Sequence, residues 1–336
     1  MKQRAVVTGL GTYVPERILT NQDLEHMMET SDEWIVSRTG IRERHIADPE
    51  VATSDLAVPA VQQALQEAGR SIDEMDFIFV ATNTPDTIFP STAARVQARL
   101  TSKPIPGVDV QAGCTAWIYT LAMAGAMIEA GVYRRVLVVA ADKLSAITDY
   151  QDRSTAVLFG DGAGAVVLEA YETDTYGILG SYLNADGRGG ELLSLPAGGS
   201  KQPASPETVE NRLHYLKMNG NEVFRFAVKA MPDAVEKSLA AAGLTVEDLD
   251  LLVPHQANQR IIDAAMRQFD LDADKVVSNI ERYGNTSVAS IPLALGEARE
   301  AGKLQPGQVV VLAAFGAGLT WGATVIRWGT PGGRTV

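Results

Sequence analysis

The only cysteine of the chain, Cys114, lies in a segment that could present a reactive thiol. The run Val108-Asp109-Val110 leads into a turn of small residues, and an uncharged stretch follows from residue 115 to residue 128. This pattern predicts a strand, a tight turn and a buried helix. A thiol at the start of a helix is favoured as the nucleophilic thiolate by free N–H groups and the helix dipole. Free cysteines are also often buried, so the residue type alone favours a plain structural thiol.

Two further side chains, His255 and Asn285, could take part in chemistry with Cys114. His255 follows a buried strand predicted at residues 251–253 and precedes a helix. Asn285 lies in the turn that runs through residue 287. A lone histidine is more often structural, and a turn asparagine is commonly a helix cap. Ligands of α/β sheets bind at the carboxyl ends of strands, so side chains in these places can converge.

Two glycine-rich segments carry weaker signals. Gly316-Ala317-Gly318 lies in a stretch from residue 309 to residue 326 that contains no charged residue. The length suits a membrane span, but the central glycines favour two buried strands around a turn. The segment 159–164 is glycine-rich but lacks the Lys-Ser/Thr of a phosphate-binding loop, so it is interpreted as a tight structural turn.

The composition limits the classes of function. The chain has 336 residues, 46% of them hydrophobic and 21% charged, which is typical of a soluble protein with one large domain or two ordinary ones. A single cysteine excludes a disulfide framework and fits a reducing cytoplasm. Residues 1–11 predict a strand rather than a signal peptide. The net charge of −12 argues against nucleic acid or anionic lipid as partners, so an acidic partner must find a local basic patch.

The sequence repeats itself at an offset of about 174 residues. Residues 60–76 match residues 234–250 in character, and residues 136–141 resemble residues 309–314. Both copies predict helices alternating with apolar strands, hence an α/β fold with mostly parallel, doubly covered sheets. We expect halves at residues 1–174 and 175–328 with a flexible tail at 329–336. An offset of 173 relates Ser287 to Cys114. The Gly/Pro/Ser-rich segment 186–206 predicts a long loop, which is usually functional or mobile.

Seven ordered segments together resemble one family, β-ketoacyl-acyl carrier protein synthase III, the initiating condensing enzymes of type II fatty-acid synthesis. The resemblance covers about residues 4–328 and rests on residues 31–41, 108–117, 159–165, 218–224, 254–258, 284–287 and 315–322. It implies a thiolase fold, in which two pseudo-twofold-related βαβαβαββ halves form a layered αβαβα core. The chain departs from the family at Ala317, where a glycine is usual. Alanine there is compatible with the family pattern unless a positive φ is required.

The resemblance implies a decarboxylative Claisen condensation. Cys114 takes a short acyl group from acyl-CoA, and the backbone N–H groups of Cys114 and Ala317 form the oxyanion hole. Malonyl-acyl carrier protein then loses CO₂, and His255 and Asn285 donate hydrogen bonds to the enolate. No metal or cofactor is expected, because coenzyme A is a substrate and product.

The resemblance also implies binding residues and a homodimer. The expected coenzyme A contacts are Trp34, Arg38, Arg153, Gly220, Asn221 and Asn258. The expected acyl-pocket residues are Leu144, Phe315 and, reaching across the dimer interface, Phe89. Helical spacing and the need for cations on an acidic protein predict a docking patch for the carrier protein at Arg225, Lys229, Arg260 and Arg267. Solvated helix faces are the alternative for these four residues.

Other functions fit the sequence less well. Biosynthetic thiolases use a second cysteine, which this chain lacks. Chain-elongating synthases pair two histidines, and none of His26, His45 or His214 lies in a matching motif. A polyketide-type ketosynthase or acyltransferase of secondary metabolism with the same Cys-His-Asn triad stays open, because fold and triad do not fix the substrate. A non-enzymatic scaffold that binds acyl carriers also stays open.

Overall fold

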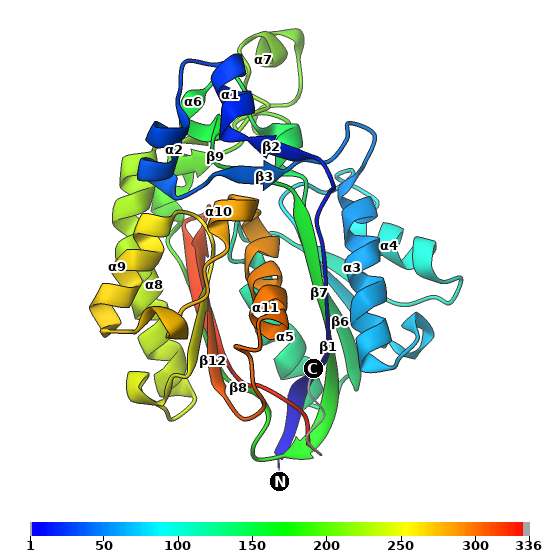
Figure 1. The fold of residues 1–336 in the computed structure, drawn as a ribbon. Helices are drawn as coiled ribbons and strands as arrows, with labels where there is room; N and C mark the ends of the chain where they lie inside the picture. The colour runs from blue at the N-terminus through cyan, green and yellow to red at the C-terminus, as the bar shows by residue number, and fades with distance from the viewer. Residues whose placement is uncertain (1, 332–336) are drawn as a thin grey trace.

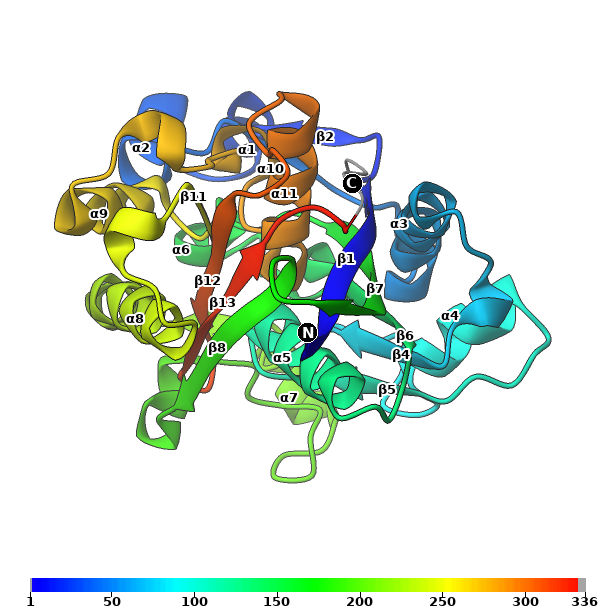
Figure 2. The same cartoon turned by 90° about the horizontal axis from the view of Figure 1, so that it is seen from below.

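Two β-sheets enclose a central layer of helices, and further helices cover the outer face of each sheet (Figures 1 and 2). A computed structural model describes residues 2–331 of the chain. Three hydrophobic clusters separate the layers, one inside and one on each outer side. The predicted α/β class with a layered αβαβα core is therefore confirmed.

Equivalent strands of the two halves follow one another in the same order in the two sheets, with β4, β6, β7 and β1 of the first corresponding to β11, β12, β13 and β8 of the second. The first runs β5-β4-β6-β7-β1 and the second β11-β12-β13-β8. β4 pairs in parallel with β5 and β6, as β11 does with β12, and the remaining pairs are antiparallel, so the expectation of mostly parallel sheets is wrong. Hairpin-like neighbours such as β12 and β13 join their strands by a tight turn and need no crossover helix. The strands are β1 (Lys2–Tyr13), β4 (Phe77–Ala81), β5 (Gly107–Val110), β6 (Arg135–Asp142), β7 (Gly162–Thr173), β8 (Gly177–Ala185), β11 (Leu251–Pro254), β12 (Val309–Gly316) and β13 (Thr320–Arg327).

The main helices occupy three layers. α5 (Ala116–Glu129) and α11 (Ser290–Glu300) lie between the sheets, α3 (Thr53–Ala68) and α4 (Thr92–Leu100) cover the first sheet, and α8 (Gly220–Ala241) and α9 (Gln259–Phe269) cover the second (Figure 2). Residues of α5 and α11 share one buried cluster with residues of both sheets. α5 is apolar all round for that reason, whereas the outer helices have one polar face.

The remaining strands and α-helices form a cap over one end of the layers, at the top of Figure 1. They are β2 (Ile18–Thr20), α1 (Asn21–Met27), α2 (Asp32–Thr39), β3 (Glu43–His45), α6 (Arg153–Ala156), β9 (Leu193–Ser194), α7 (Pro206–Glu210), β10 (Lys217–Met218) and α10 (Ile280–Tyr283). Short 3₁₀ turns occur at both ends of the layers, at Ile72–Glu74, Leu144–Ile147, Gly187–Leu192, Val246–Asp248, Ala273–Lys275 and Ser287–Ala289. The predicted loop at 186–206 runs through this cap and contains a 3₁₀ turn and the short strand β9.

The internal repeat is visible in the positions at which equivalent strands and helices begin. β4 and β11, β6 and β12, and α5 and α11 each begin 174 residues apart. The strand equivalent to β5 is reduced in the second half to one parallel bridge between Leu252 and Val276. At the offset of these elements Ser287 corresponds to Gly113 rather than to Cys114, so the relation expected at 173 residues is wrong by one position.

The first sheet uses only residues up to Thr173, and the second begins at Gly177. A division near residue 174 stays a prediction that this arrangement supports. At the other end, Gly329 and Thr330 are buried, so the predicted flexible tail begins in packed structure. Residues 332–336 of that tail lie outside the described part of the chain.

The uncharged stretch at 309–326 forms β12 and most of β13, as the glycine turn predicted. Both strands are almost wholly buried, because helices cover the two faces of their sheet. No helix within residues 2–331 has the length and apolar character needed to cross a membrane.

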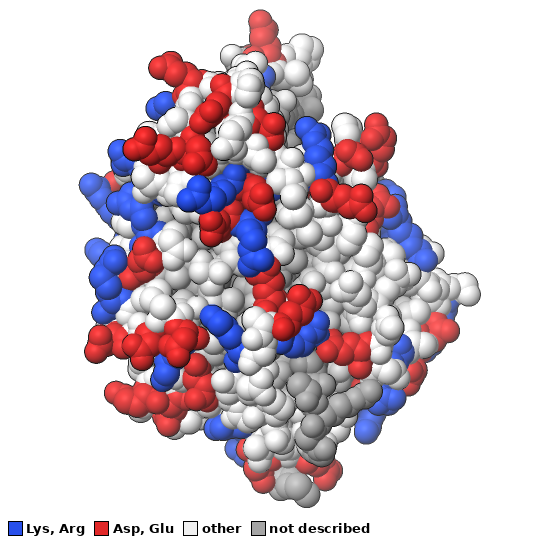
Figure 3. All heavy atoms as spheres, viewed as in Figure 1, with Lys and Arg blue, Asp and Glu red and all other residues white. Residues whose placement is uncertain are grey.

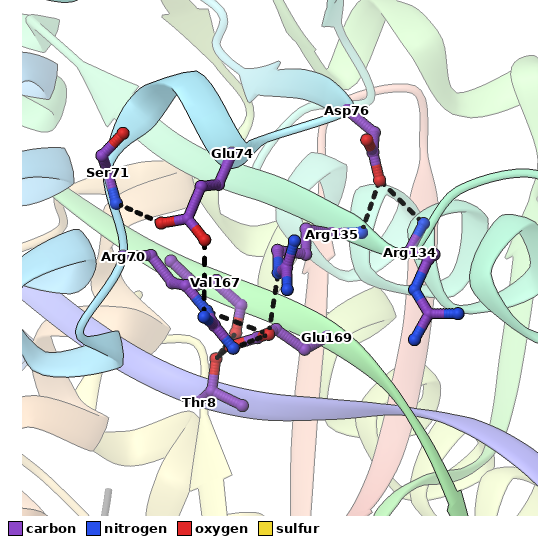
Figure 4. Close-up of polar contacts among 9 residues, drawn as sticks. All are labelled: Thr8, Arg70, Ser71, Glu74, Asp76, Arg134, Arg135, Val167 and Glu169. Atoms are coloured by element: carbon purple, nitrogen blue, oxygen red, sulfur yellow. Dashed lines mark hydrogen bonds and ion pairs between the residues drawn. The ribbon is translucent and has the colours of Figure 1, made fainter.

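A buried carboxylate ties the first sheet to its outer helix (Figure 4). Glu169 on β7 accepts hydrogen bonds from Arg70 Nη2 at 2.8 Å, Arg135 Nε at 3.0 Å and Thr8 Oγ1 at 3.0 Å. Burial raises the pKa of Glu169, but these hydrogen bonds outweigh it and hold the pKa below its usual range. None of these residues lines a cavity that contains Cys114, so the cluster serves the fold.

Candidate active site

Cys114 lies where two cavities meet. It stands two residues before α5 and lines both a cavity of about 150 Å³ and a larger one of about 340 Å³. His255 and Asn285 line the larger cavity with it. The structure therefore brings the three predicted catalytic residues to one site, between the cap and the carboxyl ends of the strands.

The turn before Cys114 packs closely against the loop after β12. Gly113 has φ +56°, and a Cβ at Gly113 would lie 2.5 Å from the backbone nitrogen of Ala317. A Cβ at Gly316 would likewise lie 2.5 Å from the backbone nitrogen of Cys114. Glycine is required at both positions because the two backbone segments pack too closely to leave room for a Cβ atom. Ala317 is not among the residues with positive φ, which explains why alanine is tolerated there.

His255 is fixed directly after β11. Its backbone N–H donates to the carbonyl of Ala313 at 2.8 Å, and its ring Nδ1 lies 2.7 Å from the hydroxyl oxygen of Ser290 on α11. The ring of Phe315 packs edge-on against it with the centroids 5.5 Å apart. A hydroxyl can donate or accept, so Ser290 can support either neutral tautomer, and Nε2 is left as the nitrogen available for chemistry.

Asn285 is held by its backbone and by its amide oxygen. Its backbone N–H donates to Leu158, and its carbonyl accepts from Gly160, so the glycine-rich segment at 159–164 is the structural turn that the sequence predicted. The Oδ1 atom of Asn285 accepts a hydrogen bond from the backbone N–H of Ser287 at 2.9 Å. The amide NH₂ is therefore the end of the side chain that remains for a ligand.

Burial controls the protonation of the two ionisable groups. It lowers the pKa of His255 to about 3, so the imidazole is neutral at physiological pH. It also raises the pKa of the Cys114 thiol to about 12, against hydrogen bonds from Ser287 and the backbone that act to lower it. The helix start favours the thiolate, as the sequence indicated, but burial opposes it. Cys114 and His255 therefore form a neutral thiol and imidazole before substrate enters.

The larger cavity also gathers most of the predicted coenzyme A contacts. Its lining includes Trp34, Arg38, Gly220, Asn221 and Asn258. The guanidinium of Arg153 lies 4.5 Å above the Trp34 ring.

The Asn258 amide already has two partners within this cavity. It caps α9 through the backbone N–H of Arg260 and donates to the carbonyl of Arg38 at 3.0 Å.

The smaller cavity is mostly apolar. It is lined by Asn83, Gln111, Gly113, Cys114, Leu144, Ile147, Phe159, Leu193, Ser194, Leu195, Leu216, Ser287 and Ala317. Of the three residues expected in the acyl pocket, Leu144 lines this cavity, whereas Phe315 lies on the larger cavity against His255. Phe89 lines neither cavity of its own chain and is 83% exposed. Three of the lining residues come from the predicted loop at 186–206.

The predicted docking patch comes from two helices that pack together, α8 and α9. All four of its residues are exposed: Arg225, Lys229, Arg260 and Arg267. Arg225 pairs with Glu222 at 2.6 Å, and the guanidinium of Arg260 lies 5.2 Å over the Phe224 ring. Basic side chains gather at the left edge of Figure 3, where α8 and α9 lie in Figure 1, and acidic ones dominate the cap.

Sequence reasoning missed three polar residues at the site. Ser290 contacts His255, while Asn83 and Ser287 line the smaller cavity beside Cys114. Asn83 follows the end of β4, so the rule that ligands bind at the carboxyl ends of strands could have identified it. The contacts of Ser287 and Ser290 are long-range and leave no local signal.

The comparisons with known proteins agree with one another. Residues 108–187 match the family described as 3-oxoacyl-[acyl-carrier-protein (ACP)] synthase III, and residues 239–328 match its C-terminal region. The β-ketoacyl-[acyl-carrier-protein] synthase III of Caldanaerobacter subterraneus is 54% identical over 97% of this chain and 98% of its own.

Solved structures show the same likeness. The structure of the Thermus thermophilus synthase III is 48% identical, covers 97% of this chain and all of its own, and has a TM-score of 0.90. The priming β-ketosynthase of the R1128 polyketide pathway covers 98% of this chain and 99% of its own, with a TM-score of 0.89, but is 34% identical. The thiolase fold implied by the sequence resemblance is confirmed.

Proposed function

The chain belongs to the 3-oxoacyl-[acyl-carrier-protein] synthase III family, and from this premise we propose that Cys114, His255 and Asn285 are its catalytic residues. It is an acyl-transferring condensing enzyme that initiates fatty-acid synthesis. The observation that carries the residue assignment is the place of the Cys114 sulfur at the junction of two cavities, with His255 and Asn285 on the larger one.

In the first half-reaction the Cys114 sulfur attacks the thioester carbonyl of acyl-CoA. The new carbon–sulfur bond forms as the bond to the CoA sulfur breaks, and the thiol proton passes through His255 Nε2 to the departing CoA sulfur. His255 can do this because its imidazole is neutral and Ser290 supports either tautomer. The backbone N–H groups of Cys114 and Ala317 stabilise the oxyanion. The acyl chain then occupies the smaller cavity.

In the second half-reaction malonyl-acyl carrier protein replaces CoA in the larger cavity. The malonyl group loses CO₂, and the negative charge moves to the thioester oxygen of the enolate. His255 Nε2–H and the Asn285 amide donate to that oxygen, and both are neutral, so they stabilise the enolate without protonating its carbon. The enolate carbon attacks the acyl group on Cys114, and the sulfur leaves as thiolate, which takes up a proton from water to restore the thiol.

Coenzyme A would bind along the larger cavity, with its adenine at Trp34 and Arg153 and its phosphates near Arg38. Gly220, Asn221 and Asn258 would line the passage for the pantetheine arm. The carrier protein would dock on the basic patch of α8 and α9, next to the mouth that Arg260 lines. An acidic chain needs such a local patch to bind an acidic partner.

A homodimer fits the exposed surface of the first sheet. β5 is an edge strand, and Val108 on it is 42% exposed. Ile88 and Phe89, in the loop between β4 and α4, are 82% and 83% exposed. Open strand edges and apolar patches of this kind are typical of protein interfaces. In such a dimer the family resemblance implies that Phe89 would reach the acyl pocket of the partner.

The chemistry proposed for these residues needs no metal or prosthetic group, and CoA is a substrate and product. A cytoplasmic location fits the need for a reduced Cys114. The relatives do not favour the polyketide-type alternative, since the R1128 enzyme is 34% identical whereas the Caldanaerobacter synthase is 54% identical.

The division of roles is tested by separating the half-reactions. Both His255→Ala and Asn285→Ala should still become acylated by acetyl-CoA, but His255→Ala should do so more slowly because it loses the carrier of the thiol proton. Each should lose malonyl decarboxylation by about 10²–10³-fold, which is typical of an oxyanion donor. The measurements are the mass of the acyl-enzyme and the release of labelled CO₂. If both variants fail to acylate as completely as Cys114→Ala, the assignment of these donors to the second half-reaction is wrong.

A further inference from the structure

Ser287 has an unusual backbone next to the nucleophile. Its φ is +51°, a conformation that costs non-glycine residues about 1–3 kcal/mol and persists only where surrounding contacts impose it. Its backbone N–H donates to Asn285 Oδ1 at 2.9 Å, and its hydroxyl oxygen lies 3.4 Å from Cys114 Sγ. One buried residue thus contacts both the nucleophile and the enolate donor.

The donor and acceptor roles in the hydrogen bonds around Ser287 are fixed by a buried carboxylate. Asp142 is fully buried and accepts from Asn83 Nδ2 at 3.1 Å, from Thr82 Oγ1 and from the backbone of Asn83. A carboxylate only accepts, so the Asn83 amide must turn its NH₂ group toward Asp142. The second hydrogen of that NH₂ group points at Ser287 Oγ, also at 3.1 Å.

Ser287 Oγ therefore accepts from Asn83, and its own hydrogen needs an acceptor. Within the described part of the chain, the hydroxyl contacts only Asn83 Nδ2 and Cys114 Sγ. Asn83 Nδ2 is a donor, so Cys114 Sγ is the acceptor that satisfies the hydroxyl. A buried hydroxyl without an acceptor is destabilising, which favours this orientation further.

We propose that Ser287 is a further catalytic residue, whose hydroxyl, aimed by Asn83 and Asp142, donates a hydrogen bond to the Cys114 sulfur and stabilises it as thiolate. Asn83 is then a positioning residue. The inference rests on the proposed role of Cys114 as nucleophile. Ser287 keeps its own proton throughout, while the thiol proton of Cys114 leaves through His255 to the CoA sulfur.

Under this proposal Ser287 assists other steps of the reaction than His255 and Asn285 do. Sulfur carries negative charge when it attacks acyl-CoA and again when it leaves the condensed product. Ser287 should therefore assist acylation and product formation. It should not assist malonyl decarboxylation, in which the charge develops on the malonyl oxygen and not on the Cys114 sulfur.

The test uses Ser287→Gly and Ser287→Ala in the full chain. Both remove the hydroxyl, but glycine also relieves the backbone at φ +51°, so one variant controls for strain and folding. Single-turnover acylation of Cys114 by acetyl-CoA should slow by about tenfold or more in both, as expected for a hydrogen bond to a charged atom. Malonyl decarboxylation, measured by CO₂ release, should change less than about twofold.

Thr286→Val is the matched control. The Thr286 hydroxyl is buried beside Ser287 and has no hydrogen-bond partner within residues 2–331. Its removal should leave acylation unchanged. Asn83→Ala should slow acylation in the native background but add nothing in Ser287→Gly, a coupling that a purely structural role would not produce.

Acylation at the native rate in Ser287→Gly, or an equal loss in Thr286→Val, would overturn the proposal. So would a loss of decarboxylation as large as the loss of acylation. A failure of the proposed function itself looks different, because the native enzyme would then carry no acyl group on Cys114.

Discussion

The guanidinium of Arg153 lies 4.5 Å above the ring of Trp34 and also donates to the carbonyl of Glu29 at 3.0 Å. The two side chains thus already form a stack, and its Trp34 ring lines the larger cavity. A flat aromatic base between them would replace one cation–π contact by two stacking contacts. In the coenzyme A site that we propose, adenine would stack on Trp34 and displace the Arg153 guanidinium from the ring.

Removal of the Trp34 ring should weaken coenzyme A binding without affecting the chemistry. Trp34→Ala should raise the KM for acetyl-CoA by about tenfold, in line with the one to three kcal/mol of a base–aromatic stack, and leave kcat nearly unchanged. The matched control is an acetyl thioester of pantetheine, which lacks the nucleotide and should show no change in KM. If Trp34→Ala raised the KM for acetyl-CoA and for the pantetheine thioester by the same factor, Trp34 would lie outside the nucleotide site.

The size of the smaller cavity predicts short primers. An apolar cavity of roughly 150 Å³ holds a molecule about as large as benzene, so chains of about two to five carbons should fit. The measurement is the rate of acyl-enzyme formation with acyl-CoAs of increasing length. Leu144→Ala should shift the preference to longer chains. Faster acylation by lauroyl-CoA than by acetyl-CoA in the native enzyme would contradict this prediction.

The basic patch on α8 and α9 predicts a defect confined to the carrier protein. Arg260→Glu and Arg267→Glu should raise the KM for malonyl-acyl carrier protein, most strongly at low salt, because charges at an interface rim act through the association rate. Transfer from acetyl-CoA to Cys114 should stay nearly native in Arg267→Glu, because Arg267, unlike Arg260, does not line the larger cavity. Arg134→Glu, at an exposed residue directly before β6, is the control. An unchanged KM in both patch variants at low salt would exclude this surface.

The burial of His255 predicts an unusual pH profile. With its pKa lowered to about 3, the imidazole stays neutral from pH 5 upward, so the donor at Nε2 is not altered by titration in that range. Malonyl decarboxylation by the acylated enzyme should be flat between about pH 5 and 8. An ordinary histidine would titrate near 6.5 and produce an acid limb there. An acid limb at that pH, absent in His255→Gln, would show that burial does not hold the imidazole neutral.

Much of this architecture could be predicted because it is encoded locally. The apolar runs of β6 and β12, the uncharged stretch that forms nearly all of α5 and the glycine turn before β13 each follow from a short pattern. The positions of Cys114 and His255 followed from one rule, that ligands of α/β sheets meet at the carboxyl ends of strands.

The rest depends on contacts between distant residues. The hydrogen bonds from Asp142 through Asn83 to Ser287 connect three separate segments, and no spacing in the sequence relates them. The raised pKa of Cys114 is a consequence of tertiary burial, which a turn motif cannot report. Phe315 lies on the cavity of His255 because the loop after β12 folds against the Cys114 turn, and only the packed backbone shows that.

The central claim is that Cys114 holds the acyl group, and the chain offers a clean test because it contains no other cysteine. The native protein and Cys114→Ala would each be incubated with acetyl-CoA and analysed by intact-mass and peptide mass spectrometry. We expect one acetyl group per native chain, on the peptide that contains Cys114, and none in the variant. Acetylation of Cys114→Ala to the native extent, or a native acetyl group on any other peptide, would contradict the account.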